Sequence, residues 1–272
     1  MILVTGGGGF SGSRIVARLV SDGERPRALV RDESAARRKL PAEVEIVVGD
    51  TTRPESLAPA LAGVETVIHT AFITAERKQG PGVSYYDTNV RGTENLVAAA
   101  RSTGVQRIIV LSGLGTRMDK PGSYMQGRFL AEEAVRQSGL AWSILGPSVQ
   151  FGPGSAFFKG LTDLIRQVPV VPMIGSGRRR FQPIYAEDVV TCLLKMAREP
   201  QRYDGQRLDV GGPDIYTYAH ILDMLMGTMG KRKLKIPGPM PFVAIGAGIM
   251  EAVLPHPPIT AAALGLFTFD NI

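Results

Sequence analysis

The first fourteen residues, MILVTGGGGFSGSR, constrain the fold of this chain more than any other stretch. Residues 2–5 are apolar or β-branched and predict a short buried strand that runs into a glycine-rich turn and then a helix. The turn has the spacing T-G-x-x-G-x-x-G, with Gly6, Gly9 and Gly12 at the fixed positions. We expect Gly6 to turn the chain off the strand, Gly9 to let a phosphate approach the backbone, and Gly12 to let the helix pack closely.

The helix that follows the turn is predicted to be amphipathic, because Ile15, Val16, Leu19 and Val20 recur at helical spacing. A lone glycine motif can be an ordinary turn. Between a strand and an amphipathic helix, however, it favours a dinucleotide whose pyrophosphate faces the helix N-terminus.

Length and composition exclude several classes of protein. A chain of 272 residues, 44% hydrophobic and 21% charged, fits one large α/β domain with a smaller second lobe. Cys192 is the only cysteine, which excludes an internal disulfide and fits a reducing cytoplasm. Three scattered histidines predict no metal site, and the short apolar start predicts no secretory signal. The net charge of +6 is mostly spread out without aromatic interleaving, which argues against a nucleic-acid partner.

The remaining chain alternates strand and helix patterns. Further strands are expected at 26–30, 43–48, 66–69, 106–111, 141–145 and 207–210, and a long helix at 85–102. This alternation predicts a doubly wound parallel Rossmann sheet with right-handed crossovers. Residues 1–150, with 183–212 returning to them, are expected to form the dinucleotide-binding core. Residues 151–182 and 213–272, where Gly, Pro and Met are frequent, are expected to form a smaller substrate lobe.

The end of the second strand bears on cofactor choice. An acidic residue there binds the ribose 2′-hydroxyl of NAD, whereas an arginine accommodates the 2′-phosphate of NADP. Arg31 takes this place, followed by Asp32, and Arg14 could assist. This favours NADP over NAD, although Arg31 could also be an ordinary solvated side chain.

Polar residues follow the next two strands. Asp50 could accept a hydrogen bond from the adenine amino group, or it could cap a helix that begins near Pro54, a role open equally to Thr51 and Thr52. Thr70 and Ala71 are expected over the cofactor at the end of the fourth strand. His69 is expected to be a hydrogen-bonded structural residue rather than a catalyst.

Several motifs, in this order, resemble the short-chain dehydrogenase/reductase superfamily. They are TGGGGFSG at 5–12, GDT at 49–51, NVRGT at 89–93, Ser112, Tyr124 with a basic residue four later, PSVQFGPG at 147–154, FQPIYAEDV at 181–189 and GGP at 211–213. The later motifs look most like the atypical branch related to the 39 kDa accessory subunit of mitochondrial complex I, whose members are NAD(P)H-binding or epimerase-like proteins.

The resemblance implies a chemistry for three residues. Tyr124 would be the acid/base for hydride transfer, Ser112 would donate a hydrogen bond to the developing oxyanion, and Arg128 would stand where the family has lysine. Arginine keeps the positive charge but cannot relay a proton. Gly146 departs as well, because relatives carry an arginine there. Both Tyr124 and Arg128 could instead be solvated residues of a helix face.

The cofactor site implied by the motifs is larger than the glycine turn. Its residues are Gly6, Gly9, Phe10, Ser11, Gly12, Arg31, Asp50, Thr51, Thr70, Ala71, Pro147 and Ser148.

Two functions remain open from the sequence. One is an NAD(P)-dependent oxidoreductase or epimerase-like enzyme acting on a small carbonyl or hydroxyl compound. The other is a non-catalytic NAD(P)H-binding scaffold or sensor of a membrane or respiratory complex. The apolar run 239–254 is too short to span a bilayer comfortably and is expected to pack as a helix on the core. The alternative is an exposed face for a partner or membrane, beside the basic residues 231–235.

Overall fold

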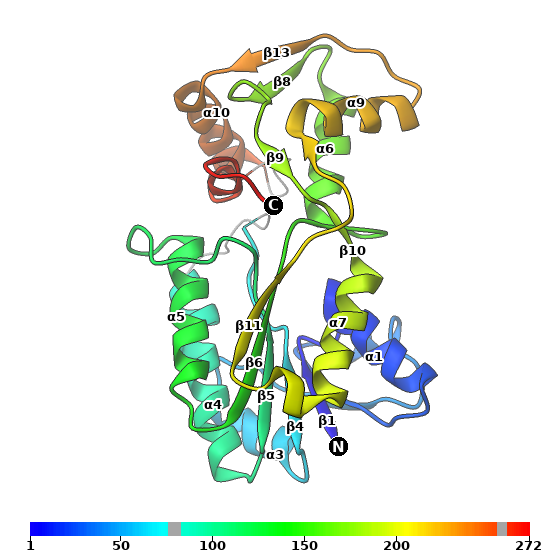
Figure 1. The fold of residues 1–272 in the computed structure, drawn as a ribbon, viewed down its shortest axis with the longest axis vertical. Helices are drawn as coiled ribbons and strands as arrows, with labels where there is room; N and C mark the ends of the chain where they lie inside the picture. Colours follow the sequence, from blue (N-terminus) through cyan, green and yellow to red (C-terminus); the bar gives the residue numbers. More distant parts are fainter. Residues whose placement is uncertain (76–82, 255–259) are drawn as a thin grey trace. The chain divides into compact units, whose positions relative to one another are not determined.

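The computed structural model describes residues 1–75, 83–254 and 260–272. These residues form two compact units, which are coloured along the chain in Figure 1. The larger unit takes Met1–Ile73, residues 83–147 and Ala186–Val210. The smaller unit is built mainly from Ser148–Tyr185 and Gly211–Ile272. The chain therefore leaves the larger unit after Pro147 and returns to it at Ala186.

A parallel sheet forms the centre of the larger unit. In the described part of the chain its seven strands are β1 (Ile2–Thr5), β2 (Arg27–Val30), β3 (Glu45–Val48), β4 (Thr66–His69), β5 (Arg107–Leu111), β6 (Ala141–Pro147) and β11 (Gln206–Val210). Their order across the sheet is β3-β2-β1-β4-β5-β6-β11, and every neighbouring pair is parallel. The predicted doubly wound Rossmann sheet is confirmed. The strand order reverses between β1 and β4, the position at which such sheets bind ligands.

Strand β6 is longer than the sequence predicts. It was expected to end at residue 145, but it continues through Gly146 and Pro147 because these two pair with Asp209 and Val210 of β11. Pro147 has no N–H to donate, but its carbonyl accepts from Leu114 N at 2.9 Å. The other strands begin and end within two residues of their expected limits.

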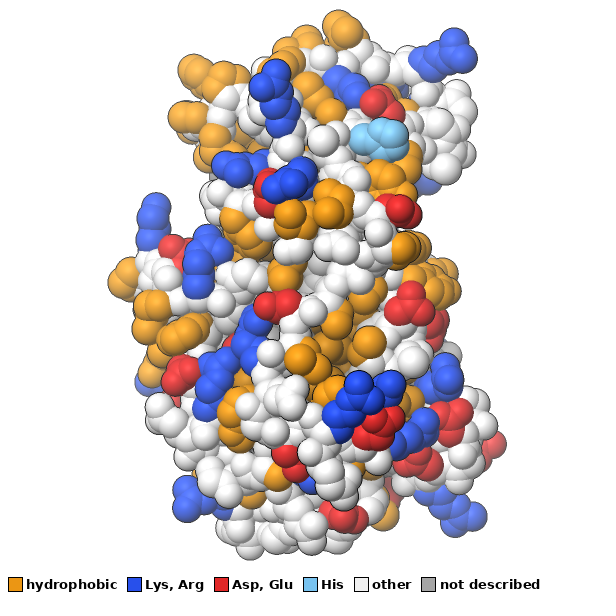
Figure 2. All heavy atoms as spheres, viewed as in Figure 1, with side chains coloured by type: hydrophobic (Ala, Val, Ile, Leu, Met, Phe, Trp, Pro, Cys, Tyr) orange, Lys and Arg blue, Asp and Glu red, His pale blue; other side chains and the backbone are white. Residues whose placement is uncertain are grey.

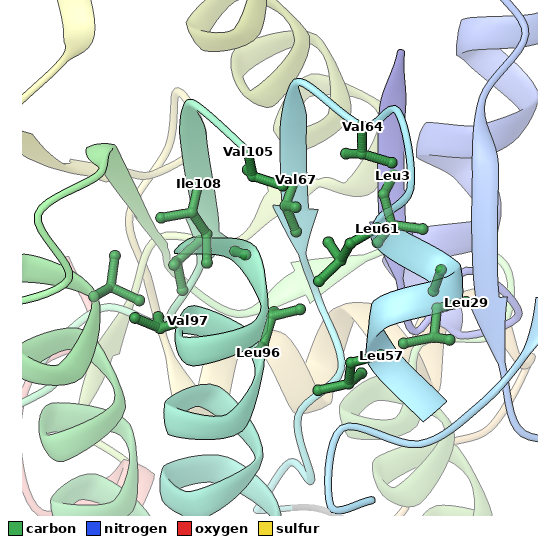
Figure 3. Packing of buried hydrophobic residues seen from close by; sticks show 14 of the residues in the cluster. Leu3, Leu29, Leu57, Leu61, Val64, Val67, Leu96, Val97, Val105 and Ile108 are labelled. Carbon is green, nitrogen blue, oxygen red and sulfur yellow. The ribbon is translucent and has the colours of Figure 1, made fainter. Parts of the chain in front are cut away.

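Helices cover both faces of this sheet. They are α1 (Phe10–Ser21), α2 (Glu33–Arg37), α3 (Leu57–Leu61), α4 (Gly92–Ser102), α5 (Tyr124–Arg136), α7 (Ala186–Arg198) and α8 (Pro200–Tyr203). Helices α3, α4 and α5 lie on one face, and α1 and α7 on the other (Figure 1). The core against α3 and α4 is purely aliphatic in its centre, where Leu3, Leu61 and Val67 meet Leu96 and Ile108 (Figure 3).

The long helix expected at 85–102 is interrupted. Its first part, Tyr86–Arg91, is a π-helix, and only Gly92–Ser102 is α-helical. Within the π turn, the buried Asn89 accepts a hydrogen bond from Ile73 N at 2.8 Å and donates one to Ile73 O at 3.1 Å. Such π turns occur frequently at functional sites. The amide of Asn89 thereby holds the chain that follows β4.

The smaller unit has short elements around an aromatic core. They are β7 (Gln150–Phe151), α6 (Ala156–Gln167), β8 (Val171–Ile174), β9 (Arg180–Phe181), β10 (Ile184–Tyr185), β12 (Tyr216–Thr217), α9 (Tyr218–Thr228), β13 (Lys235–Gly238), α10 (Met240–Val253) and the 3₁₀ helix Ala263–Phe267. Phe157, Phe181, Tyr218 and Phe267 pack with ring centroids 4.8 to 6.4 Å apart. Aromatic packing of this kind stabilises a small core.

The apolar run 239–254 forms helix α10, as expected, but it is not packed as expected. Of the fourteen residues of α10, all of which the structure describes, only Ala247 is buried. Phe242, Ile245, Ile249 and Val253 are exposed. The prediction that this helix packs on the core is therefore wrong. Among the described residues, no helix is both long enough and apolar enough to cross a membrane.

Candidate cofactor and active site

The glycine turn between β1 and α1 has the geometry that its sequence predicts. Gly6 has a φ of +66°, a conformation that favours glycine, and the Gly9 N–H donates to Gly6 O at 2.8 Å. A Cβ atom at Gly12 would lie 2.2 Å from Gly6 O, so no side chain fits there. The helix begins at Phe10 with Gly9 as its N-cap. An uncapped helix start behind a tight glycine turn is the arrangement that binds a pyrophosphate.

The end of β4 meets this turn. A Cβ atom at Gly6 would lie 3.0 Å from Ala71 Cα, and Thr70 Oγ1 donates to Thr5 O at 2.7 Å. Gly6, Thr70 and Ala71, three of the predicted cofactor residues, therefore lie together at the carboxyl ends of β1 and β4.

The end of β2 separates its two charged residues. Asp32 caps α2, because its Oδ1 accepts from Ala35 N at 2.8 Å. Arg31 is exposed, and among the residues that the structure describes its side chain has no hydrogen-bond or ion-pair partner. The acidic residue is thus occupied by the backbone, whereas the arginine is available to a phosphate. Arg14 forms an ion pair with Glu187 at 3.0 Å and lies over the Phe10 ring.

Asp50 does not cap the next helix, so that alternative is wrong. The 3₁₀ turn Pro54–Ser56 has Arg53 at its N-cap and receives no side-chain cap from any residue that the structure describes. Instead, Asp50 Oδ1 accepts from the N–H and the hydroxyl of Thr52, both at 2.9 Å. Contact between Asp50 and adenine stays a prediction. Thr51 is buried, and its carbonyl accepts from Asn95 Nδ2 at 3.0 Å.

His69 is a structural residue. Its Nδ1 lies 2.7 Å from Thr5 Oγ1 and its Nε2 lies 3.0 Å from Thr93 Oγ1, and the side chain is fully buried. The Thr93 hydroxyl donates to Asn89 O at 2.5 Å, so Thr93 accepts from the His69 Nε2–H and the Thr5 hydroxyl donates to Nδ1. Burial, and to a lesser degree the charge of Arg128, lowers the pKa of His69 from 6.5 to about 3.

This histidine predicts a pH dependence of stability. In the unfolded chain His69 binds a proton near pH 6.5, whereas in the folded protein it stays neutral to about pH 3. The unfolded state therefore binds more protons in this window, and the free energy of unfolding falls as the pH falls, by about 1.4 kcal/mol per unit. Urea unfolding at pH 7.0, 6.0, 5.0 and 4.5 measures the slope. In His69→Asn the slope between pH 6 and 4.5 should be smaller, and an unchanged slope would contradict this assignment.

Tyr124 and Arg128 form a pair on α5. Arg128 is only 5% exposed, and its Nε donates to Tyr124 Oη at 3.1 Å. Its Nη1 donates to Leu111 O, the end of β5, at 2.9 Å, and its guanidinium lies 4.3 Å over the Phe72 ring. Arg128 is thus a buried cation, and the alternative of a surface arginine is wrong. A hydrogen bond from a cation stabilises negative charge on the phenol oxygen.

Ser112 follows β5 and is also buried, but its hydroxyl has a partner that the sequence analysis missed. Ser112 Oγ donates to Glu132 Oε1 at 2.5 Å. Glu132 Oε2 accepts from Arg136 Nη2 at 2.7 Å and from Arg207 Nε at 2.9 Å. A hydroxyl carries a single proton to donate. The predicted oxyanion role therefore requires the Ser112 hydroxyl to turn away from Glu132, and it stays a prediction.

Arg207 of β11 brings a cation to the place where Gly146 lacks one. Its Nη2 donates to Gly113 O at 3.1 Å, and a Cβ atom at Gly146 would lie 3.0 Å from the same nitrogen. Such a Cβ would also lie 2.2 Å from Asp209 Oδ1. The glycine thus leaves room for the Arg207 and Asp209 pair on the neighbouring strand.

The two residues that the sequence analysis missed, Glu132 and Arg207, differ in how far the sequence could have indicated them. Glu132 follows Tyr124 and Arg128 at intervals of four, so its place on the same helix face could be read from the sequence. Arg207 carried no such signal, because its partner Glu132 lies 75 positions away.

Pro147 and Ser148 fall on either side of the unit boundary. Pro147 ends β6, and its carbonyl accepts from Leu114 N at 2.9 Å. Ser148 belongs to the smaller unit, where its hydroxyl donates to Asn271 O at 3.0 Å. Their predicted contacts with the cofactor stay predictions, as do those of Phe10 and Ser11.

The sheet order and the glycine turn together define a Rossmann-type dinucleotide-binding protein. A family model described as NAD(P)H-binding matches residues 6–150. The chain therefore belongs to the NAD(P)H-binding family and, with its relatives, to the short-chain dehydrogenase/reductase superfamily.

Named relatives agree with this family. A ceramide reductase of Caulobacter vibrioides is 31% identical over 253 residues, which cover 93% of this chain and 78% of that protein. Subunit 9 of the NADH dehydrogenase [ubiquinone] 1 alpha subcomplex of Arabidopsis thaliana mitochondria is 23% identical, covering 99% and 68%. The structure is also similar to MoeE5 in complex with UDP-glucose and NAD, with a TM-score of 0.73 at 24% identity, over 89% and 86% of the two chains. The similarity to MoeE5 is a similarity of fold alone.

Proposed function

We propose that this protein is an NADP-dependent oxidoreductase that reduces a carbonyl group of a small molecule. The observation that carries the proposal is the buried Arg128, whose Nε donates to Tyr124 Oη at 3.1 Å. Membership of the NAD(P)H-binding family and the relative named ceramide reductase support it. The lone thiol Cys192 fits the cytoplasm as its location.

The residues of the turn fit a dinucleotide. Because a Cβ at Gly12 would lie 2.2 Å from Gly6 O, the glycine lets α1 begin close against the turn, where the N–H groups of the helix start would face a pyrophosphate. A bound nicotinamide supplies the hydride for the carbonyl carbon. Tyr124 would give its proton to the carbonyl oxygen, and Arg128 would hold the phenol in place and stabilise the phenolate left behind. Because arginine stays protonated, the proton that restores Tyr124 would come from water rather than through Arg128.

The test of this proposal is oxidation of NADPH, followed by absorbance, with a panel of aldehydes and ketones that differ in hydrocarbon length. Turnover that depends on the carbonyl compound supports it. Tight NADPH binding without turnover of any panel member would count against it.

Arg31 predicts the cofactor preference. Replacing Arg31 with alanine should raise the Kd for NADPH about tenfold and leave the Kd for NADH unchanged, because a charge-assisted hydrogen bond to the 2′-phosphate would be lost. Isothermal titration of both reduced cofactors measures this. Arg18→Ala is the matched control, since Arg18 is paired with Asp22 at the far end of α1. Equal losses for NADPH and NADH in Arg31→Ala would assign Arg31 another role.

A second candidate is a non-catalytic NAD(P)H-binding subunit of a membrane complex. The relative from Arabidopsis thaliana carries the name of a complex I subunit, and α10 exposes an apolar face. Recovery of the protein from membranes in a fixed ratio with partner chains, together with no turnover in the panel, would favour this function over the first.

A further inference from the structure

The smaller unit exposes an apolar surface that the proposed reaction does not use. It is made by Leu234 and Ile236 at β13 and by Phe242, Ile245, Ile249 and Val253 on α10, and we call it the apolar face. Each of these six side chains is 50 to 75% exposed. Figure 2 shows hydrophobic side chains gathered over α10. A group of large apolar side chains exposed together often marks an interaction site.

The β13 segment is oriented opposite to an ordinary surface strand. Lys233 Nζ donates to Ile165 O at 2.6 Å and also to Val168 O, and Lys235 Nζ pairs with Asp223 Oδ2 at 2.6 Å. The lysines are therefore held by the unit itself, while the alternating Leu234 and Ile236 are left exposed. A strand normally places its apolar side chains inward and its charges in water. This inversion indicates that an apolar medium covers Leu234 and Ile236.

Helix α10 supports the same interpretation. The four exposed residues Phe242, Ile245, Ile249 and Val253 follow at intervals of three or four and share one side of the helix. Helix α10 has fourteen residues and is about 21 Å long, shorter than the roughly 20 residues that span a bilayer. It can therefore lie in a membrane surface but cannot cross it.

The charges around the apolar face indicate what kind of partner surface it can bind. No acidic residue occurs between Asp223 and Glu251, whereas Lys231 and Arg232 stand just before β13. Arg232 is exposed, and its side chain forms no hydrogen bond or ion pair within the described part of the chain. Glu251 Oε2 accepts from Ala261 N at 3.0 Å, so its carboxylate is held by the chain that follows α10. A basic edge beside an apolar face is complementary to anionic lipid headgroups over acyl chains.

We propose that the apolar face docks the smaller unit on the surface of an anionic lipid bilayer, with α10 and β13 at the depth of the headgroups and Lys231 and Arg232 on lipid phosphates. This goes beyond the proposed reaction, because docking requires neither cofactor nor turnover. Its failure would leave the reductase proposal standing, and the reverse also holds.

The experiment is flotation of the purified protein with vesicles of phosphatidylcholine alone and with added phosphatidylglycerol. We expect the wild-type protein to float with the anionic vesicles and less so at high salt, because salt screens exposed charges. Ile249→Glu should lower the partition about tenfold or more, as expected for loss of one buried isoleucine. The pair Lys231→Glu and Arg232→Glu should remove the preference for anionic vesicles.

Met118→Glu is the matched control, because Met118 is an exposed apolar residue of the larger unit, and this variant should float like the wild type. Circular dichroism verifies that each variant is folded. The proposal is overturned if the wild type does not bind anionic vesicles, or if Ile249→Glu binds them equally. It is also overturned if the wild type elutes as a dimer that Ile249→Glu splits, since the apolar face would then contact a second copy.

Discussion

Replacing Tyr124 by phenylalanine is expected to lower kcat for a carbonyl substrate by about 10²- to 10⁴-fold, the usual contribution of a positioned general acid. The phenol oxygen is the atom to which Arg128 Nε donates at 3.1 Å, so removing it deletes the proton donor and leaves the buried guanidinium without that partner. The Kd for NADPH should change little, because the glycine turn lies on β1 and α1. Stopped-flow measurement of NADPH oxidation with saturating substrate gives kcat, and titration with NADPH gives the Kd.

Tyr203→Phe is the control for this variant. Tyr203 ends α8, just before β11 begins, and therefore lies at the amino edge of the sheet, away from the site. This variant should keep wild-type turnover. Arg128→Met should also reduce kcat while leaving NADPH binding intact, since it removes the cation that stabilises the phenolate. If Tyr124→Phe turned over the substrate as fast as the wild type, Tyr124 would be excluded as the acid.

Ser112 and Tyr124 need not have equal roles. The Ser112 proton is donated to Glu132, and Glu132 is neutralised by Arg136 and Arg207. The two guanidiniums hold the other carboxylate oxygen of Glu132, so the acceptor of the Ser112 proton is fixed in place. We therefore propose the phenol of Tyr124, rather than the Ser112 hydroxyl, as the principal donor to the substrate oxygen.

The sheet could be predicted from the sequence because its information is local. The inner strands β1, β2, β4, β5 and β6 are largely buried and appear in the sequence as short apolar runs, and the polar residue after such a strand marks the edge where ligands bind. Gly6, Thr70 and Ala71 were placed together on this reasoning, and the structure shows them in contact.

The side-chain partnerships could not be predicted, because they join residues distant in sequence. Arg207 reaches Glu132 and Gly113 only because β11 pairs with β6, a neighbour that the sequence pattern does not specify. The burial of Arg128 depends likewise on Phe72, which follows β4, and on Leu111, the last residue of β5. The prediction that α10 packs on the core was wrong for another reason. An apolar helix normally packs against other parts of its own chain. The sequence alone does not show whether the rest of this chain covers α10.

A methyl group at Gly12 should abolish most cofactor binding. In Gly12→Ala the new Cβ would lie 2.2 Å from Gly6 O, 2.9 Å from Gly6 C and 3.0 Å from Gly7 Cα. All three atoms belong to the backbone of the turn, so no flexible side chain can move aside. The turn or the start of α1 must shift instead, and the amides that would hold the pyrophosphate shift with it. We expect the Kd for NADPH and for NADH to rise about tenfold or more, and the free energy of unfolding to fall by about 1 to 3 kcal/mol.

Gly8→Ala is the matched control, because a Cβ at Gly8 finds its nearest neighbours at 3.9 Å in the side chains of Ala36 and Val30. It inserts the same methyl group into the same turn without a clash. Fluorescence titration with both cofactors and thermal unfolding of the two variants measure the difference. Because the prediction concerns both cofactors equally, it is separate from the role of Arg31, which concerns NADPH alone. If Gly12→Ala bound both cofactors as tightly as Gly8→Ala, the pyrophosphate would have to bind elsewhere than at the β1–α1 turn.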